Sequence, residues 1–465
     1  MKVQIRNLGI VREADIDLKP LTVFIGPNNT GKTWVAYALG GILGLYGWGK
    51  YIDAYINSQV NADYHNVLAS IQQEILEKGR AALDIVQFTD ECLETYVNHV
   101  ASVAKGWITA FIGVSPQHIK DFTIHFDFLR DKEEILERIK KSAMRTRYGF
   151  GKAREEALFN VSKEKDSHEL RFFTSSLDES EEDLLHEDIQ TFVARPVFRL
   201  MQRSIFRNTI IFPAERTTLV TLKFKIDSRE LNENETYFSI DDAESPSPPQ
   251  PVGYFLGMLI DLYRRGNTSQ FADNDGMGQL AQILETNILQ GTVDFSTPEP
   301  HPSREIMFQA NDNTLLGISA ASSMVKELAP LVLYLKYQAK KGELIIIDEP
   351  EMNLHPEAQV RMAEFLAIMV HAGLRVLITT HSPYIIDHLT NLMKAAKHED
   401  KDTIRDLFYL KQEEAFISQD NVAVYFFDEG TAYNILENDG LINWQTFSQV
   451  SERVSQIFFD MDEVA

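Results

Sequence analysis

Eight consecutive residues carry the strongest chemical signal in this chain of 465 residues. They read Gly26-Pro27-Asn28-Asn29-Thr30-Gly31-Lys32-Thr33, a phosphate-binding pattern in which two glycines frame four residues and Lys-Thr follows. Glycine has no Cβ, so the backbone can wrap closely around an anion with its N–H groups pointing inward. Lys32 would bring positive charge to the β- and γ-phosphates of a nucleotide, and the Thr33 hydroxyl would bind Mg²⁺.

The residues on both sides of this loop have the order that a phosphate loop requires. Residues 21–25 are a short apolar and β-branched run, which predicts a buried strand. Residues 34–39 continue as a helix. Strand, loop and helix in this order predict a nucleotide-binding site that includes every residue from Gly26 to Thr33.

Two acidic residues come directly after another apolar run, residues 344–347. This run predicts a buried strand, so Asp348 should lie at the carboxyl edge of a sheet, where α/β folds bind ligands. Asp348 would hold Mg²⁺ there, directly or through water. Glu349 would diverge from the metal and accept a proton from the water that attacks the γ-phosphate. The alternative role for these acids is to cap the following turn.

Two further features could contact phosphate. His381 follows a predicted strand over 375–380, and a neutral imidazole there could donate to a γ-phosphate, although strand-end histidines are more often structural. Residues 319–323 read Ser-Ala-Ala-Ser-Ser and open a long apolar helix that extends to about Lys340. Their hydroxyl and N–H groups would form a phosphate-binding surface with no evident ligand in the same subunit, and an N-cap is the simpler interpretation.

The net charge of −23 argues against general binding to the nucleic-acid backbone. Two basic groups are local exceptions that could contact DNA, RNA or an acidic protein, although a solvated face paired with acidic neighbours is the simpler interpretation. The second group repeats every four residues, which would align it on one face of a helix over 190–207. The groups are Arg138, Lys140, Lys141, Arg145, Arg147, Lys152 and Arg154, and Arg195, Arg199, Arg203 and Arg207.

Cysteine use and hydropathy indicate the compartment. The single cysteine, Cys92, cannot form an internal disulfide and lacks zinc-binding neighbours, so we expect a small buried side chain in a reducing compartment. The N-terminal residues are strand-like and do not resemble a secretory signal. The longest apolar run, residues 35–48, contains four glycines and predicts a buried helix and turn, not a membrane span. We therefore expect a cytoplasmic protein without membrane contact.

Strands that alternate with helices predict an α/β fold with a mostly parallel sheet covered on both faces. A helical pattern dominates from about residue 50 to 145, with spaced apolar residues at Val67, Ile71, Ile75 and Leu83, and it predicts a short protrusion over 60–145. Further strands are predicted at 3–5, 14–18, 122–128, 157–161, 170–173, 209–212 and 422–427. Helices are predicted at about 252–265 and 277–290, and an exposed loop over 241–251.

The motifs together resemble the ABC-type ATPases of the RecF/SMC/OLD group. The Asp-Glu-Pro-Glu-x-x-Leu-His-Pro string and Pro213-Ala214-Glu215-Arg216 are most similar to the OLD-like ATPases of bacterial antiphage defence systems of the Septu and PARIS types. The resemblance rests on residues 26–33, the serine-rich helix start, 345–351, Leu354-His355-Pro356 and Thr380-His381-Ser382-Pro383.

The resemblance implies an ABC-type P-loop ATPase head that binds ATP and Mg²⁺. It implies the roles described above for Lys32, Thr33, Asp348, Glu349 and His381. By the same resemblance, Ser322 and Ser323 would replace the signature motif, which closes on ATP held by a second copy of the chain. Asn353-Leu354-His355 would lie in the D-loop that runs between the two copies. Arg216 would lie near the γ-phosphate. The chain departs from the family because it lacks a Gly-Gly pair in the signature motif and an identifiable Q-loop glutamine.

The predicted organisation has five segments. Residues 1–50 would begin the head, and 51–205 would form a mostly helical insertion with a few strands. Residues 206–310 would return to the head and include the 241–251 loop. Residues 311–400 would carry the signature helix, Asp348 and His381, and 401–465 a strand and helices. The insertion has no long heptad run, which argues against an SMC-scale coiled coil.

OLD enzymes carry a Toprim nuclease after the ATPase, whereas about 80 residues follow His381 here. Asp460-Met461-Asp462 fits an acidic tail better than a metal site. We expect an ATPase without its own nuclease, working as a homodimer or higher homo-oligomer. It would control a separate nuclease or toxin in antiphage defence, with a phage protein or nucleic acid as trigger. The alternatives are a DNA-binding RecF/SMC-like repair or chromosome ATPase, and a signalling scaffold with little ATP turnover, against which Glu349 argues.

Overall fold

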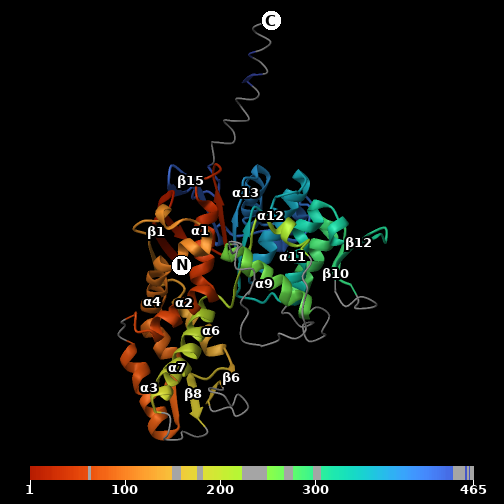
Figure 1. Cartoon of the computed structure of the whole chain (residues 1–465). Helices are drawn as coiled ribbons and strands as arrows, with labels where there is room; N and C mark the ends of the chain where they lie inside the picture. The colour runs from red at the N-terminus through yellow and green to blue at the C-terminus, as the bar shows by residue number, and fades with distance from the viewer. Residues whose placement is uncertain are drawn as a thin grey trace. The chain divides into compact units, whose positions relative to one another are not determined.

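The computed structural model describes residues 1–60, 64–148, 159–174, 182–222, 249–265, 276–296, 305–443, 456–457 and 460 (Figure 1). The chain divides into two compact units. Unit 1 consists of Met1–Gly9 and Ala38–Thr209, and unit 2 consists of Ile10–Tyr37 and Ile210–Ala465. Several expectations fall outside the described residues, namely most of the 241–251 loop, Lys152, Arg154, Met461 and Asp462.

Unit 2 is organised around a mostly parallel sheet. Its strands follow the order β2-β16-β15-β3-β14-β13-β9. The central strands β15, β3, β14 and β13 are parallel to one another, and every residue of β3 and β13 is buried, as in a sheet covered on both faces. The predicted α/β fold is therefore confirmed. The strands are β2 (Val11–Asp17), β3 (Leu21–Ile25), β9 (Thr209–Phe212), β13 (Leu344–Asp348), β14 (Arg375–Thr379), β15 (Val422–Asp428) and β16 (Thr431–Asn434).

Helix starts in unit 2 carry recognisable caps. The Ser322 hydroxyl accepts from the Val325 N–H (3.3 Å) before α11, and the Ser382 hydroxyl accepts from the Ile385 N–H (3.1 Å) before α13. Helix α12 packs on β14 and β3. The helices are α1 (Lys32–Leu43), whose residues from Ala38 belong to unit 1, α8 (Arg216–Leu219), α9 (Gln250–Arg265), α10 (Met277–Leu284), α11 (Ser323–Tyr337), α12 (Pro356–His371), α13 (Pro383–Ala396) and α14 (Lys401–Arg405).

Unit 2 also contains a small antiparallel sheet that the sequence pattern did not predict. Its order is β10-β11-β12, with Val293 opposite Phe308 and Phe308 opposite Leu316. A π-helical turn over Glu285–Leu289 precedes it. The strands are short and separated by loops, so their periodicity is weak. They are β10 (Gly291–Phe295), β11 (Ile306–Ala310) and β12 (Leu315–Gly317).

Unit 1 combines helices with a four-stranded antiparallel sheet in the order β4-β8-β7-β6, and β1 pairs with β5. The elements are β1 (Lys2–Leu8), α2 (Leu45–Ile56), α3 (His65–Lys78), β4 (Arg80–Asp84), α4 (Ile85–Val103), α5 (Ile108–Ile112), β5 (Thr123–Asp127), α6 (Lys132–Lys141), β6 (Met144–Tyr148), β7 (Phe159–Lys163), β8 (Glu169–Thr174) and α7 (Glu182–Ile205).

Three details of the sequence prediction need correction. Leu83 lies in strand β4 opposite Leu170 and not in a helix, because Gly79 ends α3 in a left-handed conformation. Helix α7 ends at Ile205, so Arg207 does not share its face with Arg195, Arg199 and Arg203. Helix α11 ends at Tyr337 instead of near Lys340.

The core of unit 1 is rich in aromatic and neutral polar groups. Tyr96 stacks on Phe198 with ring centroids 5.1 Å apart. Its hydroxyl donates to Gln202 Oε1 (2.9 Å), while Gln202 Nε2 donates to the Leu43 carbonyl (2.6 Å) at the end of α1. Cys92 is a half-buried free thiol. Within the described parts of both units, no helix has the length and apolar character needed to cross a bilayer.

Candidate functional site

The loop of residues 26–33 has a conformation that only glycine allows at two positions. Gly26 has φ +138°, and a Cβ there would lie 2.3 Å from the Phe427 carbonyl oxygen in β15. Gly31 has φ +92°, and a Cβ there would lie 2.3 Å from Val11 Cγ2. The loop therefore sits directly against β15 and β2, and α1 begins at Lys32, where the first N–H groups have no acceptor within the helix.

Lys32 is buried under this loop. Its Nζ donates to the carbonyl oxygens of Gly26 (3.0 Å) and Pro27 (2.7 Å), and the residue is 5% exposed. Burial lowers the pKa of Lys32 to about 8, an effect opposed by the carboxylates of Glu349, Asp348 and Glu351. An anion beside this ammonium group would stabilise its charged form.

Asp348 is the meeting point of three hydroxyl groups. Thr33 Oγ1 donates to its Oδ1 at 3.0 Å, Tyr37 donates to its Oδ2 at 3.0 Å, and the Thr379 hydroxyl donates to Oδ1. Thr33 and Asp348 are thus brought together, as the sequence predicts. Sequence reasoning missed Tyr37 and Thr379. Tyr37 lies on α1 one turn after Thr33, and this spacing was the available signal.

Glu349 occupies a left-handed conformation with φ +51°. Its N–H donates to the Thr379 carbonyl (3.0 Å), and its Oε1 lies 3.8 Å from His381 Nε2. Burial, together with the charges of Asp348 and Glu351, raises the pKa of the Glu349 carboxyl. Burial and the Lys32 charge lower the pKa of His381. The pair is therefore a carboxylate with increased proton affinity beside a neutral imidazole.

His381 is held in place through its backbone. Its N–H donates to Glu351 Oε1 (2.6 Å), and burial raises the pKa of this glutamate. The adjacent Ser382 hydroxyl donates to Gln359 Oε1 (2.6 Å) on α12. Glu351 and Gln359 were not predicted as part of the site, because their partners lie far along the chain.

Arg216 has partners other than the expected γ-phosphate. Its Nη1 donates to the carbonyl oxygens of Pro213 (2.8 Å) and Asp348 (2.6 Å), and its Nη2 donates to that of Glu349 (2.8 Å). Nη2 also forms an ion pair with Glu327. Arg216 is 2% exposed, so it supports the Asp348–Glu349 backbone from within the protein.

Ser322 and Ser323 are exposed at the start of α11. Ser322 acts as an N-cap, and within the described chain neither serine hydrogen-bonds to the other predicted site residues. His355 caps α12, with its Nδ1 accepting from the Glu357 N–H at 3.4 Å. Asn353 has φ +59°, and its amide donates to Glu327 at 3.2 Å.

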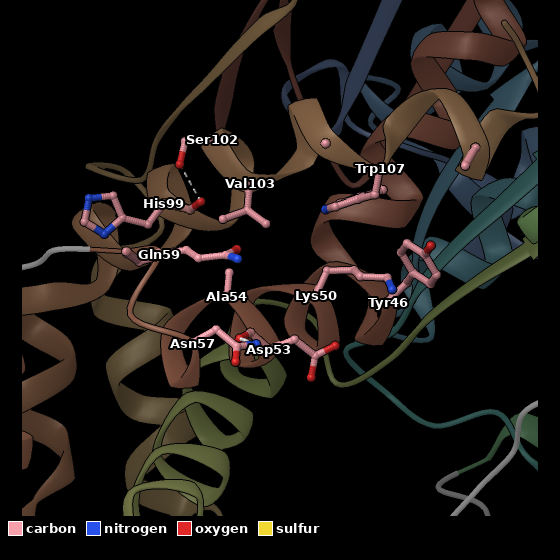
Figure 2. A pocket seen from close by; sticks show the side chains of 13 residues that line it. Tyr46, Lys50, Asp53, Ala54, Asn57, Gln59, His99, Ser102, Val103 and Trp107 are labelled. Atoms are coloured by element: carbon pink, nitrogen blue, oxygen red, sulfur yellow. Dashed lines mark hydrogen bonds between the residues drawn. The ribbon is translucent and has the colours of Figure 1, made fainter. Parts of the chain in front are cut away.

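A separate groove of about 790 Å³ lies in unit 1 (Figure 2). Figure 2 shows the indole nitrogen of Trp107 directed into this space, with the Gln59 amide extending toward it from the other side. The Lys50 ammonium lies 5.5 Å from the centre of the Tyr46 ring. None of the residues from which the sequence predicts phosphate binding lines this groove.

Comparisons with known proteins identify relatives of part of the chain. It is 29% identical to the Old nuclease of Escherichia phage P2 over 126 residues, which are 27% of this chain and 21% of the relative. It is 33% identical to the ABC-type transporter cns4 of Cordyceps militaris over 72 residues, 16% of this chain and 5% of the relative. The chain thus aligns with about a fifth or less of these relatives.

Two solved SMC head structures are also similar. One is bound to the C-winged helix domain of ScpA, with a TM-score of 0.37, 10% identity and coverage of 93% of this chain and 96% of the other. The second, from Thermotoga maritima, has a TM-score of 0.32, 9% identity and coverage of 94% and 97%. The model of the AAA ATPase domain family matches residues 1–386 of this chain. Because this match spans most of the sequence, the chain belongs to the AAA ATPase domain family.

Proposed function

We propose that this protein is a Mg²⁺-dependent, ABC-type switch ATPase that hydrolyses ATP held between two copies of the chain. The observation that carries the proposal is the convergence of four groups from three distant segments of the chain at one edge of the unit 2 sheet. These are the loop of residues 26–33, Asp348, Glu349 and His381, linked by the Thr33–Asp348 hydrogen bond and the approach of Glu349 to His381.

The loop and Lys32 would bind the phosphates of ATP. The two glycines give the loop its close turn, and the start of α1 supplies N–H groups and a helix dipole. Among the described residues, Lys32 donates to two carbonyl oxygens of the same loop. It would transfer these donors to phosphate oxygens, which balance its charge better than carbonyl groups do.

Thr33 and Asp348 have the chemistry and spacing of Mg²⁺ ligands. Two adjacent ligands of an octahedral Mg²⁺ lie about 3.0 Å apart, given metal–oxygen distances of about 2.1 Å. Thr33 Oγ1 and Asp348 Oδ1 are 3.0 Å apart. Mg²⁺ bound there would neutralise charge that develops on the phosphates. Tyr37 would keep the Asp348 carboxylate oriented through its own hydrogen bond.

Glu349 would accept the proton of the attacking water, and His381 would donate to the γ-phosphate. Burial and the neighbouring carboxylates raise the pKa of Glu349, which increases its affinity for the proton that it would accept. The lowered pKa of His381 keeps its imidazole neutral, so one ring nitrogen can donate while the other accepts.

A second copy would complete the site. Ser322 and Ser323 lie exposed at the N-terminus of the 15-residue helix α11, which offers hydroxyl and N–H groups to an anion outside the subunit. A homodimer, or a higher oligomer built from such pairs, would place these serines against ATP held by the partner.

The closed state would control a separate effector, a nuclease or toxin, in antiphage defence in the cytoplasm, with a phage protein or nucleic acid as trigger. The motif resemblance to OLD-like defence ATPases and the partial similarity to the phage P2 Old nuclease support this step. The alignment spans only 21% of that nuclease, so the effector is a proposal that rests on the motif resemblance.

Light scattering with an ATPase assay tests the proposal. The wild type should hydrolyse ATP in a Mg²⁺-dependent reaction, and Glu349→Gln should double its solution mass when ATP and Mg²⁺ are added. Lys32→Ala should do neither. The proposal that ATP is held between two copies would be contradicted if the wild type shows no turnover. It would also be contradicted if ATP changes the solution mass of the Lys32→Ala variant as it does that of Glu349→Gln.

A further inference from the structure

Four side chains form a polar cluster behind Glu349, which we call the Arg216–Glu327 cluster; Arg216 and Glu327 are buried, Thr217 is half-buried and Asn353 is exposed. Arg216 and Glu327 are 2% and 1% exposed and form an ion pair. The second carboxylate oxygen of Glu327 accepts from the Thr217 hydroxyl and from Asn353 Nδ2 (3.2 Å). Both oxygens of Glu327 therefore have partners, as a buried charge requires.

Arg216 also holds the main chain that carries the proposed general base. Its guanidinium binds the carbonyl oxygens of Asp348 (2.6 Å) and Glu349 (2.8 Å). On the other side, the Glu349 N–H binds the Thr379 carbonyl (3.0 Å). The left-handed conformation of Glu349 (φ +51°) is unfavourable for a residue with a Cβ and persists only when surrounding contacts fix it.

The other end of the cluster lies on helix α11. Glu327 is one turn after Ser323, so it belongs to the same rigid helix start as the exposed serines. Asn353 comes from the turn that follows Glu349. The cluster therefore joins the start of α11, the turn at Asn353 and the backbone of Glu349 through direct contacts within unit 2.

We propose that Arg216 is a positioning residue that fixes Glu349 for proton acceptance and, through Glu327, makes this alignment depend on the position of the α11 start. The inference rests on the proposed ATPase function. A group that binds at Ser322 and Ser323 and moves α11 would also move Glu327, then Arg216 and the Glu349 carbonyl. Binding of a second copy at Ser322 and Ser323 would thus change the position of Glu349 in the same subunit.

Variants of the neutral members of the cluster test the proposal with the least disturbance of the fold. Asn353→Gly keeps the left-handed backbone and removes the amide, and Thr217→Val removes a hydroxyl while preserving shape. Each deletes one donor to a buried carboxylate, so we expect kcat to fall about tenfold, with the KM for ATP within about twofold. A role confined to fold stability would lower the unfolding temperature and leave kcat unchanged.

Matched controls are available in the same unit. Asn313 also has a positive φ (+67°) and is exposed, so Asn313→Gly makes the same change away from the cluster. Thr218 is the exposed neighbour of Thr217, and Thr218→Val repeats the hydroxyl loss. Both controls should keep the wild-type kcat, and their failure to do so would overturn the assignment to this cluster.

The charged members give a larger effect. Arg216→Lys keeps the charge but cannot reach three carbonyls and a carboxylate at once, so kcat should fall by about 100-fold or more. If this variant fails to fold, the kcat values of Asn353→Gly and Thr217→Val test the positioning role instead. A wild type without ATP turnover would refute the proposed function itself. A wild type with turnover, together with an Asn353→Gly/Thr217→Val double variant of unchanged kcat, would refute only the positioning role.

Discussion

The two units bury polar groups of different kinds. Among the described residues, unit 2 buries seven charged side chains and unit 1 buries one. The single buried charge of unit 1, Lys163, donates to three backbone carbonyls. Those of unit 2 are Lys32, Arg216, Glu285, Glu327, Glu343, Asp348 and Glu364.

Unit 1 satisfies its core mainly with neutral hydroxyl and amide groups. The Tyr51 and Tyr64 hydroxyls hydrogen-bond to each other, and Tyr64 reaches His99 Nδ1 at 3.1 Å. Burial raises the pKa of both phenols, so they stay uncharged at physiological pH. Buried charge is costly unless it is paired. Four of the seven buried charges of unit 2, those of Lys32, Arg216, Glu327 and Asp348, lie at or behind the candidate site.

The largest expected effect separates a buried from an exposed lysine. Lys32→Ala should abolish measurable ATP turnover, a loss of about 100-fold or more, because phosphate charge would lose its buried partner. Lys50→Ala, at an exposed site on α2 of unit 1, should leave turnover unchanged. Steady-state phosphate release measures both. Equal losses in the two variants would show that the comparison between units has no functional meaning.

Glu349→Gln should separate binding from chemistry. We expect kcat to fall about 100-fold or more because the amide cannot accept the proton, while ATP binding persists. Fluorescent-nucleotide binding and phosphate release report the two steps. Glu399→Gln, at an exposed position of unit 2, is the control and should match the wild type. Loss of nucleotide binding in Glu349→Gln would assign this glutamate to binding instead.

ATP affinity should depend on pH through Lys32. Its pKa of about 8 means that the charged form is lost as pH rises from 7 to 9, so the Kd for ATP should increase by up to about tenfold per pH unit above 8. Without nucleotide, a higher pH has a favourable effect, which acts on the free energy of unfolding. Because the folded pKa lies below the unfolded value, stability rises between pH 8 and 10.5. A pH-independent Kd, or the same slope in Lys32→Ala, would contradict this role.

The smallest expected effect lies in unit 1. Tyr64→Phe removes the hydroxyl between Tyr51 and His99, and we expect a loss of about 1–2 kcal/mol in the free energy of unfolding. ATP turnover per folded molecule should not change. Urea denaturation measures the loss, and exposed Tyr433→Phe serves as control. A fall in turnover without unfolding would show that the two units are not functionally separate.

The sequence alone predicted what local patterns determine. The strand–loop–helix at residues 21–43 and the strand ending at Asp348 are encoded by contiguous residues, so both appear where expected. The sequence also predicted that Thr33 and Asp348 lie near each other, because the carboxyl ends of parallel strands meet at one sheet edge. The hydrogen bond between them is a finding of the structure.

Other parts of the site depend on contacts across hundreds of residues. The hydroxyl of Tyr37 reaches Asp348, 311 residues away, and Arg216 reaches its carbonyl from 132 residues away. The one-turn spacing from Thr33 was the available signal for Tyr37, whereas the contact of Arg216 leaves no periodic trace in the sequence. The motif resemblance placed Arg216 near a phosphate, whereas its burial and four partners direct it to the backbone behind the site.

The close approach of Gly26 to Phe427 has a consequence for how the protein is made. Strand β3, which leads into the phosphate loop, has β14 and β15 as its two neighbours, and both come from residues beyond 374. A ribosome therefore releases the loop residues long before the strands that support them exist. A nascent chain that ends before residue 422 would lack strand β15, which packs against Gly26. We therefore expect nucleotide binding only after synthesis has passed that residue.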